Sequence, residues 1–168
     1  VFGDKLTGLY SKSYLDDEFA GMLSRWHGET ALLMIKPDNF KLINDTYGHE
    51  VGDQALRILA NRLKQLLRES DIPVRYRGNE NAVILPQTSE EEAVEEAERI
   101  REGMKHSDLS PITGGERVPL TFSIGLAMYP RHGSDNVTIA ARAHEAVFAA
   151  RDAGGDQVFC AQCEVEEA

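Results

Sequence analysis

The chain has 168 residues, of which 42% are apolar, and this is enough material for one domain with a buried core. Its 28 acidic and 18 basic residues give a formal net charge of −10, which argues against non-specific binding to nucleic acid. No apolar run approaches the roughly 20 residues that a membrane-spanning helix needs, and no signal peptide is visible.

The first half of the chain predicts a helix, a buried strand and two further helices. Apolar residues recur at helical spacing over residues 11–27, and the uninterrupted apolar run at 31–35 is typical of a buried strand. A helical pattern covers residues 40–46, breaks at Gly48 and resumes after Gly52-Asp53. In that last helix the apolar residues line one face: Ala55, Leu56, Leu59, Leu63, Leu66 and Leu67.

The second half predicts a hairpin, two helices and two strands. Apolar runs within residues 72–85 flank the dipeptide Gly78-Asn79, a combination typical of a tight hairpin turn. Ser89 and Glu92 have the spacing of a capping box, which opens a helix. The remaining elements are a strand, an Ala-rich helix and a short strand, at residues 118–128, 137–152 and 157–160.

The order of these elements predicts an α/β (α+β) fold. Between the first and fourth strands the order is strand, helices, hairpin, helix, strand, which is the split β-α-β-β-α-β arrangement with extensions at both ends. We therefore expect a central, mainly antiparallel five-stranded sheet flanked by helices.

The end of the chain carries two cysteines and an acidic tail. Cys160 and Cys163 lack the second ligand pair of a zinc site and the helix start of a redox motif, so free thiols are expected. We assign residues 1–160 to one domain and residues 161–168 to an acidic tail or a linker. Because the chain opens at Val1 rather than at methionine, a longer parent protein with flanking domains is expected.

Five sequence blocks, taken together, resemble a known family. They are Asp4-Lys-Leu-Thr-Gly-Leu9, Phe40-Lys-Leu-Ile-Asn-Asp45, Tyr47-Gly-His-Glu-Val-Gly-Asp53, Arg75-Tyr-Arg-Gly-Asn-Glu80 and Thr121-Phe-Ser-Ile-Gly-Leu-Ala127. In this order and spacing they resemble the conserved blocks of the GGDEF family, the diguanylate cyclases, and the match covers residues 2–159. The resemblance implies a nucleotidyl-cyclase-like fold that condenses two GTP molecules into cyclic di-GMP, or descent from such an enzyme. Here the signature itself reads Arg77-Gly-Asn-Glu-Asn81, which marks a degenerate member.

The resemblance implies that two carboxylates hold a metal ion for phosphoryl transfer, and both are replaced. Lys36 stands at the first position and Asn79 at the second, which changes the local charge by about +3, while one unit charge at 4 Å is worth roughly 4 kcal/mol at an effective dielectric of 20. Asp38 and Glu80 survive as acids and could hold a displaced ion. We expect no intact catalytic site and no bound metal, with Mg²⁺ only if residual activity exists. Lys36 could instead offset phosphate charge in place of the metal.

Arg77 gives a second reason to expect lost catalysis. The signature's first glycine lets backbone and nucleotide approach closely, so an arginine places a bulky side chain where substrate would lie. A solvated arginine on a turn is the alternative interpretation.

Other parts of the substrate pocket are retained. By the resemblance, Asn44 and Asp53 contact the guanine base, whose edge an amide and a carboxylate can read. Their local alternatives are a helix-end hydrogen bond and a helix N-cap. Lys41 and Arg151 fall on phosphate-contacting positions, whereas Gly155 stands where a basic residue is usual. GTP binding without turnover is therefore a candidate role.

A second nucleotide site is predicted where the long helix ends. Arg68 and Asp71 resemble the family's Arg-x-x-Asp inhibitory site, which binds cyclic di-GMP, and Arg99 matches a further arginine of that site. The guanidinium fork can pair with guanine O6/N7 or with phosphate, and the carboxylate can accept from guanine N–H groups. The alternative is local: Arg68 caps the helix C-terminus and Asp71 starts a turn.

The sequence is compatible with three classes of function. The preferred one is a degenerate, inactive GGDEF domain that binds cyclic di-GMP or GTP as a regulatory module, with an EAL or sensor domain flanking it. The second is an active diguanylate cyclase that works through Asp38 and Glu80. The third is a structural or dimerisation module without a ligand, and a homodimer is compatible with all three. We expect a cytoplasmic location, including the cytoplasmic part of a membrane-anchored protein, with no nucleic-acid partner and no membrane contact by this domain.

Overall fold

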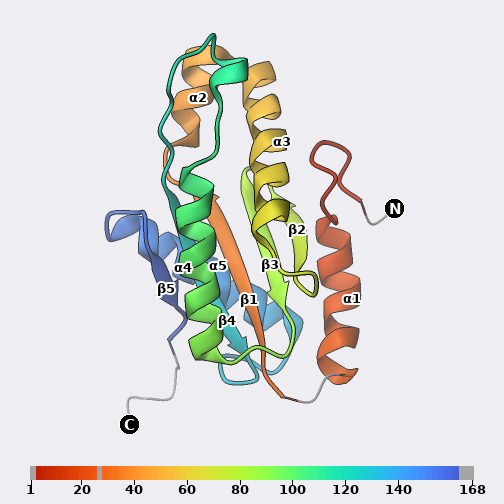
Figure 1. Cartoon of the computed structure of the whole chain (residues 1–168). Coiled ribbons are helices and arrows are strands. Elements are labelled where there is room, and N and C mark those ends of the chain that lie inside the picture. The colour runs from red at the N-terminus through yellow and green to blue at the C-terminus, as the bar shows by residue number, and fades with distance from the viewer. Residues whose placement is uncertain (1–2, 26–27, 163–168) are drawn as a thin grey trace.

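The computed structural model describes residues 3–25 and 28–162 and contains a five-stranded sheet between two layers of helices (Figure 1). The helices are α1 (Lys12–Arg25), α2 (Phe40–Tyr47), α3 (His49–Leu66), α4 (Glu90–Lys105), α5 (Asn136–Asp152) and the short 3-10 helix η1 (Ser110–Ile112). The strands are β1 (Thr30–Pro37), β2 (Ile72–Arg77), β3 (Glu80–Leu85), β4 (Phe122–Tyr129) and β5 (Val158–Cys160). Among the described residues, no helix combines the length and the apolar character needed to cross a bilayer.

The strands lie in the order β2-β3-β1-β4-β5, and among the strand pairs of the described residues only β4–β5 is parallel. From β1 to β4 the chain therefore follows the split β-α-β-β-α-β arrangement, to which α5 and β5 add a fifth strand. The predicted fold class is confirmed. Because β1 is central, its C-terminal end lies between the tip of the β2–β3 hairpin and the start of β4.

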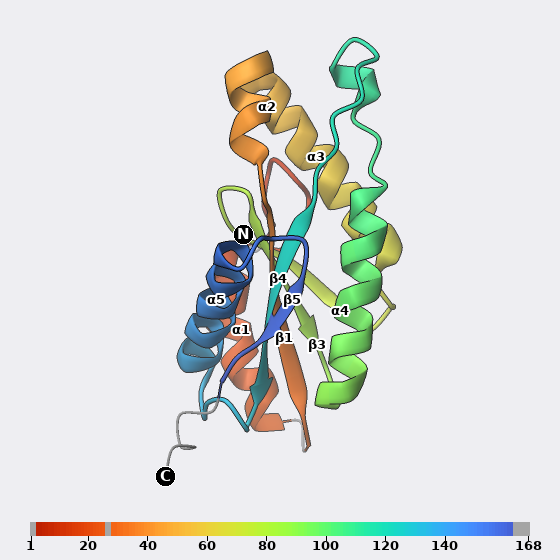
Figure 2. The same ribbon diagram turned by 90° about the vertical axis from the view of Figure 1, so that its left-hand side faces the viewer.

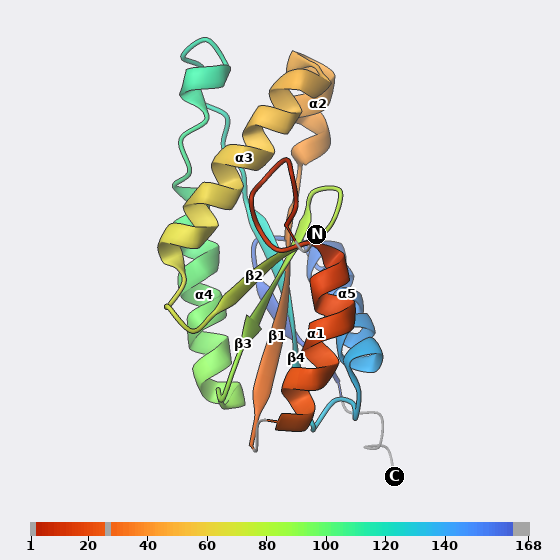
Figure 3. The ribbon, with the colours of Figure 1, turned by 90° about the vertical axis from the view of Figure 1, so that its right-hand side faces the viewer.

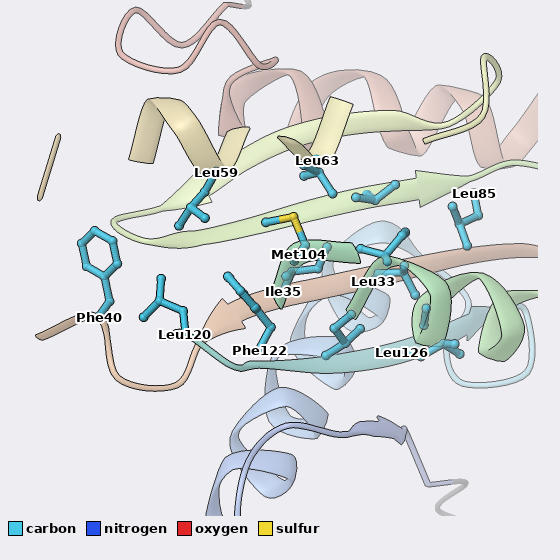
Figure 4. Packing of buried hydrophobic residues seen from close by; sticks show 14 of the residues in the cluster. Leu33, Ile35, Phe40, Leu59, Leu63, Leu85, Met104, Leu120, Phe122 and Leu126 are labelled. Atoms are coloured by element: carbon cyan, nitrogen blue, oxygen red, sulfur yellow. The ribbon is translucent and has the colours of Figure 1, made fainter. Parts of the chain in front are cut away.

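The alternating side chains of β1 supply both halves of the core. Leu33 and Ile35 belong to the cluster beneath α2, α3 and α4, which Figure 4 shows together with Leu59, Leu63 and Met104. Leu32 and Met34 face the opposite cluster, beneath α1 and α5. Figures 2 and 3 show these two helical layers on either side of the sheet. Full burial of a leucine-sized side chain stabilises a fold by about 1.5–3 kcal/mol, so the alternation fixes the register of β1.

The second long helix begins earlier than the sequence predicts. α3 starts at His49, because Gly48 with its positive φ of 92° already provides the break between α2 and α3. Gly52 lies inside α3 and allows a close contact, since a Cβ atom there would lie 1.9 Å from Asn44 Oδ1. Asp53 is therefore a residue of the first turns of α3, and the interpretation of Asp53 as an N-cap is wrong.

Other element boundaries differ from the predictions by a few residues. The strand expected at residues 118–128 forms only from Phe122, and it continues to Tyr129. α1 ends at Arg25, and Trp26 and His27, which were predicted to continue it, lie outside the described residues. Residues 163–168 of the acidic tail, Cys163 among them, also lie outside the described residues, while Cys160 has a free thiol.

Candidate functional site

The tip of the β2–β3 hairpin is held beside the end of β1. Ile35 pairs with Asn81, so the next residue, Lys36, reaches the turn formed by Gly78 and Asn79. Arg75 on β2 fixes this turn, because its Nε and Nη2 atoms donate hydrogen bonds of 3.1 and 3.0 Å to the carbonyl oxygen of Gly78. The hairpin therefore has the tight Gly-Asn turn that the sequence predicts.

The two residues that replace the expected metal ligands bind each other. Lys36 Nζ donates a 2.8 Å hydrogen bond to Asn79 Oδ1. Burial lowers the pKa of the Lys36 ammonium; the Glu80 carboxylate opposes this shift, and Arg151 and Arg77 add to it. An ammonium and an amide thus occupy the place where the resemblance predicts a carboxylate pair.

Glu80 is buried at the base of the same turn. Its side chain is 1% exposed, and Nδ1 of His144 on α5 lies 2.7 Å from its Oε2, at the distance of a hydrogen bond that the imidazole donates. The His144 ring in turn packs edge-on against Phe148, with 4.7 Å between the ring centroids. Glu80 therefore connects the hairpin to α5.

Asp38, the second surviving acid, is engaged elsewhere. Its carboxylate accepts three hydrogen bonds, from Thr121 Oγ1 (2.6 Å), Ser123 Oγ (2.6 Å) and the backbone N–H of Asp156 (2.9 Å). Asp38 therefore ties the end of β1 to β4 and to the loop before β5. Pro37 does not bend the strand away, since it pairs with Phe122 as the last residue of β1.

These side chains do not fit a divalent cation. Mg²⁺ requires carboxylate oxygens or waters in an octahedral arrangement, and here the hairpin tip and the strand end offer an amide and a cation. Asp38 and Glu80 are bound to separate partners on β4 and α5. Within the part of the chain that the structure describes, no three His, Cys, Asp or Glu side chains gather as a metal site would need.

Beside the hairpin tip lies a hollow of ≈380 Å³ between α2, α3 and the turn. It is lined by Phe40, Asn44, His49, Gly52, Asp53, Leu56, Arg75, Gly78 and Asn79. The structure thus brings together Asn44 and Asp53, the two residues predicted to contact guanine, and places them next to Asn79. Arg75, which sequence reasoning missed, lies at the same hollow.

The predicted phosphate-contacting residues lie outside this hollow. Lys41 is exposed on α2 and forms a 2.8 Å ion pair with Asp45. Arg151 on α5 lines a separate hollow of ≈410 Å³ with Asp38 and the Gly154-Gly155 turn. The two cations therefore do not meet at one place in this structure.

Arg77 does not line the hollow beside the hairpin tip. Its guanidinium carbon lies 4.9 Å from the centroid of the Tyr76 ring, and Arg77 is exposed and absent from the residues that line the hollow. Stacking of a guanidinium on an aromatic face is favourable, and it holds the Arg77 side chain against Tyr76. Arg77 therefore does not project into this hollow, and its effect on a bound substrate stays a prediction.

A second cluster lies where α3 ends and β2 begins. The Asp71 side chain is fully buried, whereas that of Arg68 is 43% exposed. Arg68 donates to Asp71 from its backbone N (2.9 Å), from Nε (3.2 Å) and from Nη2 (2.9 Å), and Nη2 also reaches Thr88 Oγ1 at 3.2 Å. These bonds hold the guanidinium in one orientation. Among the described residues, Arg68 Nη1 has no hydrogen-bond acceptor.

Arg99 joins this cluster through a residue that sequence reasoning missed. Glu96 on α4 accepts a 2.6 Å hydrogen bond from Arg99 Nη2, and the same oxygen lies 3.9 Å from Arg68 Nε. Burial raises the pKa of Glu96; Arg99 opposes this shift, and the neighbouring Asp71 carboxylate adds to it. The available signal was the position of Glu96 on the apolar face of α4, three residues after Ala93.

Comparisons with known proteins agree with this fold. Residues 1–157 match the family model described as "Diguanylate cyclase, GGDEF domain". The chain is 36% identical to the response regulator PleD of Caulobacter vibrioides over 158 residues, which cover 92% of this chain and 35% of PleD. It therefore spans about a third of the length of that relative.

Two solved structures are similar over nearly the whole chain. The GGDEF domain of TpbB (YfiN) from Pseudomonas aeruginosa superposes with a TM-score of 0.85 at 32% identity, covering 95% of this chain and 94% of that one. The GGDEF domain of DgcB from Caulobacter crescentus, in complex with c-di-GMP, superposes with a TM-score of 0.87 at 27% identity and covers 95% of both chains.

Proposed function

The chain belongs to the diguanylate cyclase (GGDEF) domain family, and we propose that it is a catalytically inactive member that regulates a larger protein by binding cyclic di-GMP. The proposed loss of activity rests on the hydrogen bond between Lys36 and Asn79. Phosphoryl transfer depends on positive charge, usually a metal ion, at the transferred phosphate. A lysine in the cation position repels a metal, and its amide partner supplies no charge to retain one.

The binding role rests on the Arg68–Asp71–Arg99 cluster. Two half-exposed guanidinium groups, 43% and 48% exposed, face outward above buried carboxylates. An arginine fork can read guanine O6/N7 or grip a phosphodiester bidentately. A similar domain, that of DgcB, has been solved with c-di-GMP, which supports this ligand class.

Titration calorimetry with cyclic di-GMP tests this role. Arg68→Ala removes a charge-assisted bidentate contact, so the binding free energy should weaken by about 1.5–3 kcal/mol. Arg77→Gly is the matched control, because it also removes one arginine but alters the hairpin turn; its affinity should stay close to that of the parent. Binding that is unchanged in Arg68→Ala, or absent in the parent, would contradict the proposal.

A second candidate ligand is GTP in the hollow beside the hairpin. The specific observation is that Asn44, Asp53 and Asn79 line one hollow and that Lys36 is hydrogen-bonded to Asn79, so a guanine base in the hollow and the Lys36 ammonium could be engaged by one nucleotide. The ammonium would then offset phosphate charge in place of a metal. GTP should bind equally well with EDTA and with Mg²⁺, and Lys36→Met should weaken binding on the order of tenfold.

Lys64→Met is the control for that experiment, because Lys64 is exposed and lies in the last turn of α3, at the end opposite Asp53. GTP binding that appears only with Mg²⁺ would show that the ammonium does not replace the metal. Failure of both nucleotides to bind would leave the structural or dimerisation role.

We further propose that the regulated activity belongs to a flanking domain. The chain spans about a third of PleD, and 17% of a second relative, the cyclic di-GMP phosphodiesterase NbdA of Pseudomonas aeruginosa, to which it is 35% identical over 134 residues. The flanking domain would be an EAL phosphodiesterase or a sensor domain, joined through residues 161–168. Cyclic di-GMP bound at α3 and α4 would then change the activity of that domain. Activity of the full-length protein with and without cyclic di-GMP, in the parent and in Arg68→Ala, tests this coupling.

A further inference from the structure

Glu96 occupies an unusual place for an acidic residue. It lies on the face of α4 that packs against the core, next to Ala93, Ala97 and Ile100, and its side chain is only 9% exposed. A buried carboxylate is costly unless it is paired, and its partners here are the two arginines of the proposed nucleotide site. One oxygen, Oε2, lies 2.6 Å from Arg99 Nη2 and 3.9 Å from Arg68 Nε.

The two buried carboxylates of this cluster hold their arginines very differently. Asp71 receives the backbone N–H, Nε and Nη2 of Arg68, so several bonds fix that pair. Glu96 accepts a hydrogen bond from Arg99, whose side chain is 48% exposed, and its carboxyl also lies close to that of Asp71. Asp71 therefore orients Arg68, whereas Glu96 forms the weaker attachment and is the group that a ligand can replace.

The cluster also lacks the excess positive charge that an anion site normally has. Arg68 and Arg99 face Asp71 and Glu96 at close range, and Glu92, one turn before Glu96, adds its negative charge near Arg68. Like-charge contacts at a binding surface cost affinity. The proximity of Asp71 to Glu96 adds to the burial of Glu96 in raising its pKa, which agrees with a crowded acidic pair.

We propose that Glu96 is a built-in anionic competitor, whose carboxylate occupies Arg99 and neighbours Arg68 and so weakens the binding of a dianionic guanine dinucleotide. The inference rests on the proposed function, because it concerns the same cluster. A phosphodiester of the ligand takes over the guanidinium of Arg99 from Glu96, and the displaced carboxylate remains nearby as a repelling charge. Neutralising Glu96 removes that repulsion, so the affinity of the site for the dinucleotide should increase.

Glu96→Gln tests the inference, since glutamine keeps an oxygen acceptor for Arg99 and removes only the charge. Titration calorimetry with cyclic di-GMP should show tighter binding, on the order of tenfold. Glu95→Gln is the matched control: it removes the same charge one residue away, from an exposed position on α4, and should leave the affinity close to that of the parent. The gain should largely disappear in an Arg99→Ala background, where the competitor has lost its partner.

The possible results separate the inference from the proposed function. Tighter binding in Glu96→Gln, or binding by Glu96→Gln alone, supports the inference. Equal or weaker binding in a folded Glu96→Gln, while the parent binds, overturns the inference and leaves the proposed function standing. Absence of binding in both proteins overturns the two together. Thermal unfolding checks that Glu96→Gln is folded. If glutamine is not tolerated there, Glu96→Ala replaces that variant, because it should also tighten the binding of cyclic di-GMP.

Discussion

Lys36 and Asn79 lie 43 positions apart in the sequence and are joined by a 2.8 Å hydrogen bond between the lysine ammonium and the asparagine amide oxygen. The bond connects the end of β1 to the tip of the β2–β3 hairpin. By the family resemblance, carboxylates at these two positions would hold a metal ion, and here the two side chains contact each other directly. The contact holds the tip of the hairpin against the end of β1 through protein groups alone, which is what the proposed loss of the metal site requires.

Replacing both residues by aspartate should restore cation binding. Lys36→Asp combined with Asn79→Asp changes the local charge by about −3, which reverses the electrostatic penalty for a divalent ion. Electron paramagnetic resonance with Mn²⁺ should detect a bound ion in the double variant and none in the parent.

In a chromatographic assay with GTP and Mg²⁺ or Mn²⁺, the parent domain should form no cyclic di-GMP.

The two single variants serve as controls, because each restores one carboxylate and should bind Mn²⁺ less tightly than the double variant. Product formed by the parent, and lost in Glu80→Gln, would show that the surviving acids suffice for catalysis. That result would favour the active-cyclase alternative.

The fold was predictable because its signals are local. Alternation in β1, the Gly78-Asn79 turn and the Ser89 capping box each depend on neighbouring residues, and the capping box is present, with Ser89 accepting from the backbone N–H of Glu92. The start of α3 was missed because Gly52 looks like a helix breaker in sequence. Its role is a close contact with Asn44, a relationship that only the packing of two helices reveals.

The candidate site was predictable in its members but not in their contacts. Comparison with the family motif identified Lys36 and Asn79 as site residues. Their direct hydrogen bond could not be predicted, because it depends on the register of β1 and β3 in the folded sheet. The stacking of Arg77 on Tyr76 depends on a rotamer that the sequence does not specify. Glu96 was missed because an acid on an apolar helix face is easily taken for a solvated residue.

Gly125 should tolerate no side chain. It lies on β4 beneath α5, where an added Cβ would lie 2.2 Å from the carbonyl oxygen of Ala143 and 2.4 Å from the backbone N of Val147. Backbone atoms of a helix cannot move as freely as a side-chain end, so Gly125→Ala should lower the free energy of unfolding by about 2–4 kcal/mol. Urea denaturation measures this change.

Gly3→Ala is the control for that variant, because a Cβ at Gly3 meets no atom of the described residues within 4 Å. Its unfolding free energy should stay within about 0.5 kcal/mol of the parent. If Gly125→Ala were as stable as Gly3→Ala, the close packing of α5 on β4 would be contradicted.

His132 should make the stability of the fold depend on pH. It is buried, with 5% of its surface exposed, and its Nδ1 accepts a 2.8 Å hydrogen bond from the backbone N–H of Met128, which requires the neutral ring. Burial lowers the pKa of His132; Glu90 opposes this shift, and Arg131 and Arg142 add to it. The folded state therefore takes up the proton at a lower pH than the unfolded state.

Because the folded pKa is depressed, the contribution of His132 is fully present above the unfolded value of about 6.5 and declines as the pH falls from there to the folded pKa. Urea denaturation between about pH 8 and pH 5 should show the free energy of unfolding falling more steeply in the parent than in His132→Gln, whose side chain does not titrate. His106→Gln, at the exposed C-cap of α4, removes a histidine without a buried acceptor role and should give a curve parallel to that of the parent. A parallel curve for His132→Gln as well would mean that His132 is not the group that links protonation to unfolding.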